Sequence, residues 1–402
     1  MKIISFCKKT IIAVVTVIMC LIIYGYYTVP DVITTIGDEK IEFSGIYSVS
    51  LNEKNYSDYE RAVKDTNNNH KSSVKLFDKI YVKSANTIIS KRKFVVPSGE
   101  IIGLRMFAKG VLIISADSVE TSDGRKNPSD VSGIKAGDLI ISVDEKQVTS
   151  ASVLSEIISA SEGKTLKIVY VRDEKEYYTD FTPVLSSDGK YKAGWWIRDS
   201  AAGIGTMTYY EKETGIYGGL GHGICDVDTS LLLPLYYGDI VEAKISGCYK
   251  GTKGKAGELC GTLSSGKIGT IYENGINGVY GILDKTDKNI KEIPVALKNE
   301  VKTGKAKIMC TADNDGVGEY EIEIEKVDMK DDSSRNLVIK ITDKNLLSKT
   351  GGIVQGMSGS PILQDGKIVG AITHVLVNDP TKGYGIFIEN MMKAAEESIK
   401  AE

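Results

Sequence analysis

The chain has 402 residues, and its 50 Lys and Arg against 53 Asp and Glu give a formal net charge of −3. This balance excludes the strongly basic surface typical of nucleic-acid-binding domains. A content of 42% hydrophobic and 26% charged residues excludes both a disordered chain and a polytopic membrane protein. Six Cys and three His are too few for a disulfide scaffold or an extended histidine-based metal site, so we expect no metal.

The N-terminal segment predicts a membrane anchor. Residues 10–30 carry no charge, and their apolar part is about as long as a helix that crosses the hydrocarbon core. Lys8 and Lys9 precede this run and Asp31 follows it, which predicts a cytoplasmic N-terminus and extracytoplasmic domains. The alternative is a cleaved signal peptide, but the stretch YGYYTVPD contains no small-x-small cleavage site.

The region that follows the anchor, residues 31–96, predicts a stalk or strand-rich linker. Its polar, Asn-rich part at 52–73 is typical of a surface loop, and we expect His70 within it to be solvated. Short apolar runs at 79–82 and 93–96 predict strands.

Residues 97–185 resemble a PDZ domain. The run GIKAGDLIISVDEKQV places a Gly137-Asp138 turn before a strand, and a helical stretch at 153–163 and a strand at 164–172 follow it. The alternative is an unrelated small α/β domain with such a turn. The resemblance implies that an extended peptide adds as a strand beside residues 110–114. It also implies a carboxylate-binding loop made by Gly103, Leu104, Arg105, Met106 and Phe107.

Residues 190–402 consist of short apolar runs separated by glycine-rich turns, which predicts a β-barrel or sandwich. Within them, Gly356-Met357-Ser358-Gly359-Ser360-Pro361 has the form of the nucleophile loop in trypsin-like serine proteases. Such a loop must present the Ser hydroxyl openly, with N–H groups directed at the developing oxyanion. We expect Ser358 to be the nucleophile, with the N–H groups of Gly356 and Ser358 as the oxyanion hole. The alternative is a structural Ser in a Gly-rich hairpin.

A Ser nucleophile needs a base, and the three His offer few choices. His222 lies in the Gly-crowded turn GGLGHGICDVD at the end of a predicted strand, where its side chain can project. His374 lies within the strand KIVGAITHV, where a satisfied barrel histidine is the better interpretation. We therefore expect His222 to be the base.

The third member is expected to be a carboxylate that orients the imidazole. Asp343 ends an apolar strand 15 residues before Ser358, whereas Asp226 and Asp228 resemble ordinary turn residues. On these residues alone we favour Asp343, with Asp226 as the alternative.

A closer resemblance joins these parts. A single membrane anchor, a PDZ-like domain and a C-terminal serine protease occur together in the stage IV sporulation protein B family of spore-forming Firmicutes, which this chain resembles over about residues 95–390. The resemblance implies a catalytic triad of His222, Asp343 and Ser358. The runs that carry it are VVPSGEIIGLRM, GIKAGDLI, GIGTMTYYEKETGIYGGLGHGI, ITDKNLLSKTGGIVQGMSGSPI and THVLVNDPTKGYGIFIE.

The same resemblance implies a fold, a role and partners. The expected fold is mainly β with α+β: a transmembrane helix, a PDZ-like domain and a trypsin-like double β-barrel. Such proteases cut themselves and then cleave a membrane-embedded regulatory protein between forespore and mother cell, which triggers sigma-factor processing; no cofactor is needed. The expected partners are this protein substrate, the chain itself and a peptide ligand of the PDZ-like domain. The expected domains are 1–30 anchor, 31–96 stalk, 97–185 PDZ-like and 190–402 peptidase.

Two other functions are compatible with the residues. One is a membrane-tethered PDZ adaptor with an inactive barrel. The other is a quality-control protease that pairs a trypsin-like domain with PDZ domains, but those carry the protease first. Cys225, three residues after His222, is interpreted as a packing residue, and pairing among Cys225, Cys248, Cys260 and Cys310 is left open.

Overall fold

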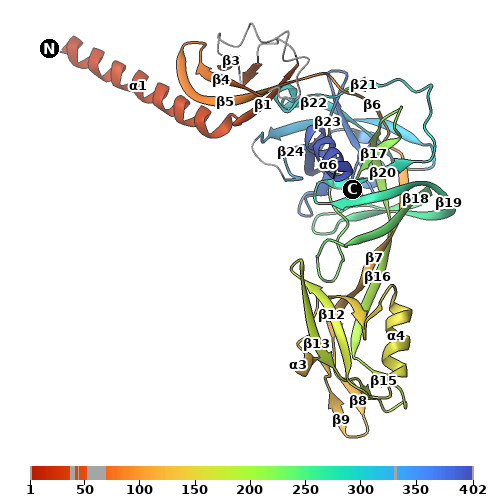
Figure 1. The fold of residues 1–402 in the computed structure, drawn as a ribbon. Helices are drawn as coiled ribbons and strands as arrows, with labels where there is room; N and C mark the ends of the chain where they lie inside the picture. The colour runs from red at the N-terminus through yellow and green to blue at the C-terminus, as the bar shows by residue number, and fades with distance from the viewer. Residues whose placement is uncertain (1, 37–40, 44, 52–68, 330–332, 401–402) are drawn as a thin grey trace.

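The computed structural model describes residues 2–36, 41–43, 45–51, 69–329 and 333–400. It is mainly β, with a long apolar helix at the N-terminus, a small sheet next to it, two β-barrels and a PDZ unit (Figure 1). The fold class expected from the sequence is confirmed.

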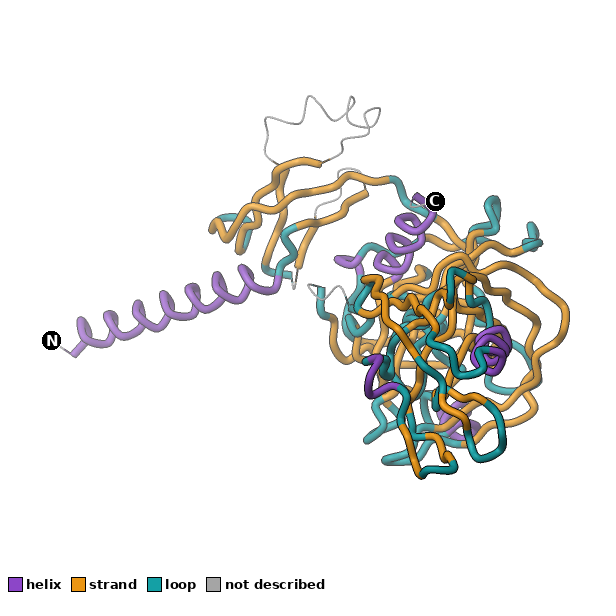
Figure 2. The backbone as a smooth tube through the Cα atoms, turned by 60° about the horizontal axis from the view of Figure 1, so that its bottom comes forward, coloured by secondary structure: helices purple, strands orange, loops and turns teal. Residues whose placement is uncertain are grey.

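Helix α1 (Lys2–Thr28) projects away from the rest of the chain in both Figure 1 and Figure 2. Its segment Lys8–Thr28 has 21 residues with a mean hydropathy of 2.2, long and apolar enough to cross a membrane by length and composition. Most of its apolar side chains are exposed.

A five-stranded sheet with its own apolar core follows α1. The strand order is β1-β5-β4-β3-β2, and Val74 and Leu76 are fully buried in it. His70 lies on β4 rather than in a solvated loop, and its Nε2 atom is buried, which corrects the sequence interpretation. Most of the Asn-rich segment expected as a loop lies outside the described residues. The strands are β1 (Val32–Ile36), β2 (Ile41–Phe43), β3 (Tyr47–Leu51), β4 (Asn69–Leu76) and β5 (Ile80–Ser90).

The first barrel is a ring of six strands in the order β7-β18-β19-β20-β17-β16, and pairing of β7 with β16 closes it. Alternate residues of β7 point inward, so that Ile102, Leu104 and Met106 are buried in its core. β6 (Phe94–Pro97) pairs with β16 and with β21 (Ile293–Pro294) beside the ring. The strands of the ring are β7 (Ile101–Ala116), β16 (Trp195–Tyr210), β17 (Ile216–Gly219), β18 (Leu235–Tyr249), β19 (Gly257–Gly275) and β20 (Gly278–Leu283).

The second barrel is also closed, in the order β22-β23-β24-β28-β27-β26. Helix α6 packs on the outside of the barrels through Met391, Met392 and Ala395, while η2 (Lys298–Glu300) precedes β22. The remaining elements are β22 (Gly304–Thr311), β23 (Val317–Val327), β24 (Leu337–Ile341), α5 (Lys344–Thr350), β25 (Val354–Gln355), β26 (Pro361–Gln364), β27 (Lys367–Val375), β28 (Lys382–Phe387) and α6 (Ile388–Lys400).

The PDZ unit is set into the first barrel, between β7 and β16, rather than preceding the barrels. The N-terminal half of β7 pairs with β18 in the barrel, and its C-terminal half pairs with β10 in the PDZ sheet β13-β12-β10-β7 (Figure 1). Gly110 marks the crossing, because a Cβ there would lie 2.5 Å from the Ile140 carbonyl oxygen. The unit also contains α3 (Ser129–Ser132), α4 (Ala151–Ala160), β8 (Val119–Thr121), β9 (Gly124–Lys126), β10 (Leu139–Val143), β11 (Lys146–Gln147), β12 (Leu166–Arg172), β13 (Lys175–Phe181), β14 (Val184–Leu185) and β15 (Tyr191–Lys192).

The Gly137-Asp138 turn that suggested this unit has a structural role. The Asp138 side chain is fully buried, accepts a hydrogen bond from Lys135 N at 2.8 Å and pairs with Arg172 at 2.6 Å. A buried carboxylate needs such partners, so this aspartate fixes the turn.

One sequence expectation about this unit is wrong. Residues 103–107 do not form a loop; they lie within β7 and pair with both β16 and β18. Their backbone groups belong to the barrel ladder, so they are not free to bind a carboxylate. Gly103 fits tightly against Leu263 and Val241, Leu104 and Met106 are buried in the barrel, and Phe107 stacks on Tyr237.

Candidate active site

The Ser358 loop joins β25 to β26 at the junction of the two barrels. Gly356 and Gly359 have φ of 97° and 98°, a conformation that favours glycine. A Cβ on Gly359 would lie 1.9 Å from the Thr206 carbonyl oxygen and 2.5 Å from Leu220 N. The sequence therefore needs glycine here to bring Ser358 up against the first barrel.

Thr206 of β16 attaches this loop to the first barrel. Its hydroxyl donates to the Gly356 carbonyl at 2.7 Å, and its backbone N–H donates to the Ser358 carbonyl at 3.0 Å. Thr206 is buried, whereas Gly356 and Ser358 are half-buried. No sequence motif marks Thr206, and only the pairing of segments 150 residues apart reveals it.

Three backbone N–H groups of this loop have partners within the fold. The N–H groups of Met357, Gly359 and Ser360 donate to the carbonyls of Val354, Ile372 and Met357. The two predicted oxyanion donors, Gly356 and Ser358, are not among these three.

His222 follows β17 in the same junction. The preceding Leu220 and Gly221 both have positive φ, 62° and 68°, which turns the chain sharply after the strand. The His222 Nδ1 atom lies 2.9 Å from the Gly223 carbonyl oxygen. Because a carbonyl can only accept, this contact assigns the proton to Nδ1 and leaves Nε2 with the lone pair that a general base needs.

Asn274, on β19, pins the chain that follows His222. Its side-chain oxygen accepts from Ile224 N at 2.8 Å, and its amide donates to the carbonyls of Ile224 and Leu233, both at 2.9 Å. The side chain is buried, and these three bonds satisfy most of its capacity. This positioning residue was missed by sequence analysis, because an Asn in a strand carries no local signal for so distant a contact.

His222 and Ser358 both lie beside strand β27, which also carries a third side chain, His374. The His222 and His374 ring centroids are 4.7 Å apart, and the Ser358 hydroxyl donates to the carbonyl of Thr373, the neighbour of His374, at 2.6 Å. The His374 Nδ1 atom is buried without a hydrogen-bond partner among the described residues. The expectation of a satisfied barrel histidine is therefore wrong.

Burial is the largest influence on the pKa of both imidazole rings. It lowers the pKa of His222 below its ordinary value of 6.5, against a smaller opposing effect of the Gly223 carbonyl. Burial also lowers the pKa of His374, to about 4, assisted by the nearby His222 and by Arg335. Both imidazoles are therefore neutral at pH 7.

The carboxylates expected near His222 have other partners. Asp343 caps α5: its Oδ1 atom accepts from Leu346 N at 2.9 Å and its Oδ2 from Glu321 N at 3.4 Å. Asp226 pairs with Arg198 and accepts from Thr229. Within the described chain, the recorded hydrogen bond of the His222 ring is the one to Gly223, so this structure does not pair either carboxylate with the imidazole.

The cysteines and the potential metal ligands complete the description of this site. Cys225 is exposed rather than packed, and Cys225, Cys248, Cys260 and Cys310 are all free thiols. Among the described residues, no group of His, Cys, Asp and Glu has the arrangement of a metal site.

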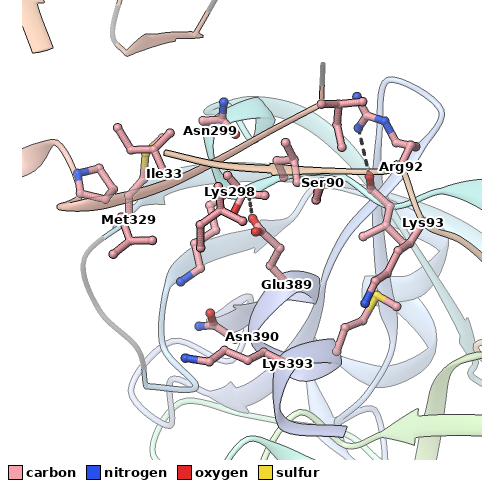
Figure 3. A pocket seen from close by; sticks show the side chains of 18 of the residues that line it. Ile33, Ser90, Arg92, Lys93, Lys298, Asn299, Met329, Glu389, Asn390 and Lys393 are labelled. Atoms are coloured by element: carbon pink, nitrogen blue, oxygen red, sulfur yellow. Dashed lines mark hydrogen bonds between the residues drawn. The ribbon is translucent and has the colours of Figure 1, made fainter. Parts of the chain in front are cut away.

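A separate pocket lies between the N-terminal sheet and α6 (Figure 3). Its floor carries Glu389, whose carboxylate accepts from Lys298 N and whose pKa is raised by burial. Arg92 at its rim pairs with Glu300. Neither Ser358 nor His222 lines this pocket, so it is distinct from the candidate active site.

Comparison with known proteins identifies two parts of the chain. A family model described as SpoIVB peptidase S55 matches residues 189–392, and a PDZ domain model matches residues 102–180. No curated protein matches the chain.

Three solved structures are similar to parts of the chain. The PDZ domain of an SdrC-like protein from Listeria monocytogenes is 24% identical, covers 22% of this chain and 87% of its own, and has a TM-score of 0.18. An HtrA-type protease, AlgW with decapeptide, is 7% identical, and the match covers 76% of this chain and 65% of the protease chain with a TM-score of 0.31. The Rv3671c protease in an inactive form is 11% identical, and the match covers 61% of this chain and 94% of the protease chain with a TM-score of 0.27.

Proposed function

Because the chain belongs to the SpoIVB peptidase S55 family and contains a PDZ domain, we propose that it is a serine endopeptidase with Ser358 as nucleophile and His222 as general base. The observation that supports this proposal is that Ser358 and His222 both lie beside residues 373 and 374 of β27, between the two barrels. The Ser358 loop comes from the second barrel and is held by Thr206 of the first, while His222 follows a strand of the first.

The proposed reaction is acyl transfer. Ser358 rotates from the Thr373 carbonyl toward His222 Nε2, loses its proton to that nitrogen and attacks the substrate carbonyl. The N–H groups of Gly356 and Ser358 stabilise the tetrahedral oxyanion, and His222 then protonates the leaving amine. Water enters next and hydrolyses the acyl-enzyme, with His222 again as base.

We propose Asp343 as the acid of the triad, on the resemblance of its segment to the family motif. In this structure Asp343 caps α5 while the Gly223 carbonyl holds His222 Nδ1. The proposal therefore includes an approach of Asp343 to His222 when the site becomes active.

The wider role that we propose is sporulation signalling. The chain would be held as a single-pass membrane protein by α1, with its sheet, barrels and PDZ domain in the space between forespore and mother cell. There it would cleave itself and a membrane-embedded regulatory protein, and so start sigma-factor processing. Family membership and the apolar helix α1 support this role.

The test compares the wild-type chain with Ser358→Ala, each expressed at full length and analysed by intact mass. We expect N-terminal fragments from wild type only, since loss of the triad nucleophile costs on the order of 10⁶ in rate. Cys225→Ser is the matched control, because it removes the exposed thiol close to His222 and should leave the fragments unchanged. Fragments from Ser358→Ala would contradict the nucleophile assignment, and intact wild type would favour the adaptor function.

A further inference from the structure

The edge of the PDZ sheet is already occupied by the chain itself. PDZ domains bind an extended peptide as an added strand at an exposed sheet edge. In the sheet β13-β12-β10-β7 the edge strand is β7, and the start of β16 pairs with it antiparallel. The paired residues are Trp195 with Ala116, Trp196 with Ser115, Ile197 with Ile113, and Arg198 with Leu112.

The side chains of this segment are held as those of a bound peptide would be. Trp195 and Ile197, two residues apart and therefore on one face, pack on the PDZ core that includes Leu154 and Ile158 of α4. The Trp195 indole donates to Ser129 Oγ at 2.7 Å, and its ring centroid lies 4.4 Å from that of Phe181.

The segment also contacts the start of α4. Ala151 N, at the first turn of this helix, donates to the Asp199 carboxylate at 2.8 Å. The start of β16 thus lies against both β7 and α4, in the place that a peptide added to this sheet edge would take.

The same segment reaches the loop that carries His222. Arg198 is paired with Leu112 in the PDZ sheet, and its guanidinium binds both Asp226 and, at 2.9 Å, Asp228. Asp226 is buried, so this ion pair fixes the chain four residues after His222. Farther along β16, Thr206 holds the Ser358 loop.

We propose that residues 195–199 are an intramolecular ligand of the PDZ domain, which an external peptide must displace. The peptide that fits is extended, with two large apolar side chains two residues apart followed by a basic residue. Displacement withdraws Arg198 from Asp226 and Asp228 and so loosens the His222 loop. The link to catalysis rests on the proposed function, whereas occupancy of the edge does not.

An engineered disulfide that can be reduced again tests whether residues 195–199 occupy the edge of the PDZ sheet. Ser115→Cys with Trp196→Cys places two thiols on one cross-strand pair, and Trp196 is 69% exposed, so the packing is little disturbed. In full-length chain that also carries Ser358→Ala, we expect the disulfide between the introduced thiols to form, as seen by peptide mass mapping. Failure of the two thiols to join would overturn the proposed pairing.

The probe is a fluorescein-labelled peptide with the sequence of residues 193–199, AGWWIRD, followed by anisotropy. We expect the reduced protein to bind it and the oxidised protein to bind at least tenfold more weakly. Equal behaviour of the two forms, including binding by neither, would overturn the proposal.

The coupling to the His222 loop is tested by hydrogen exchange in the Ser358→Ala background. We expect Arg198→Ala to speed exchange of the amides at 222–234 and Arg198→Lys, which keeps the charge, to restore part of their protection. Unchanged exchange in Arg198→Ala would overturn the coupling. Both tests read binding and exchange without turnover, so failure of the proposed peptidase activity would leave them intact.

Discussion

The rings of His222 and His374 face each other at 4.7 Å, and their planes are inclined by 36°. The two residues come from different barrels, so this contact joins the barrels at the point where Ser358 lies. Two imidazoles this close cannot both be protonated at low cost, because their charges would repel in a poorly solvated site. Burial keeps His222 in the neutral form that the proposed base requires, and the neighbouring His222 helps to lower the pKa of His374.

The pH dependence of cleavage should reflect the burial of His222. Since burial lowers the pKa of His222, the imidazole stays neutral below the ordinary histidine value of 6.5. We expect the acidic limb of kcat/KM against pH to have its midpoint below 6.5 for a peptide substrate. A midpoint at or above this value would contradict the role of a buried, neutral His222 as base.

The stability of the fold should fall as the pH is lowered through the range set by His374. Its pKa is about 4 in the folded protein against 6.5 for a free histidine, so between these values the unfolded chain binds a proton that the folded chain does not. Stability is therefore fully present above 6.5 and is lost progressively down to about pH 4. In urea unfolding, His374→Gln should lose less stability than wild type between pH 7 and pH 4, and an identical loss in both would show that His374 does not carry this dependence.

Replacing Asp343 by Asn separates its two possible roles. Asn caps a helix about as well as Asp, so Asp343→Asn should keep the melting temperature, whereas Asp343→Ala should lose about 1 kcal/mol of stability. If Asp343 is the acid of the triad, Asp343→Asn should lower kcat by about 10⁴-fold. Full activity in this variant would remove Asp343 from the triad and leave the Gly223 carbonyl as the group that orients His222.

The attachment of the Ser358 loop depends on the hydroxyl of Thr206. Thr206→Val keeps the shape but leaves the half-buried Gly356 carbonyl without this donor, which should cost about 1 kcal/mol and lower cleavage. Thr206→Ser keeps the hydroxyl and loses only a methyl group, at about 1 kcal/mol. Urea unfolding and turnover of both variants check this, and equal losses of turnover would show that the hydrogen bond contributes nothing beyond packing.

Local sequence patterns were sufficient for the parts of the site that lie on turns. The backbone conformation around Ser358 and His222 requires glycines, and the same glycines form the sequence motif that marks these two residues. The apolar helix and the Gly137-Asp138 turn were readable for the same reason: each is decided within a few residues.

Contacts between distant segments could not be read in this way. β7 runs through two units with no breaking residue at the crossing except Gly110, so its first half was interpreted as part of the PDZ domain. Thr206 and Asn274 act on loops 150 and 50 residues away, and a single Thr or Asn in a strand has no local feature that announces such a partner. The hydrogen bond of His222 to the Gly223 carbonyl is likewise a result of packing, and the spacing of the Asp residues in the sequence does not predict it.

The way β7 and β16 join the PDZ domain to the barrel has a consequence for protein engineering. Phe107 pairs directly with Ser200, so the two strands form a β-hairpin whose turn has been replaced by a whole domain. Joining residue 107 to residue 200 through Asn-Gly should restore an ordinary two-residue turn and give a protease without its PDZ domain. Conversely, any domain whose ends lie about 5 Å apart, the spacing of neighbouring strands, could be grafted at this position, on the strand β16 that also carries Thr206.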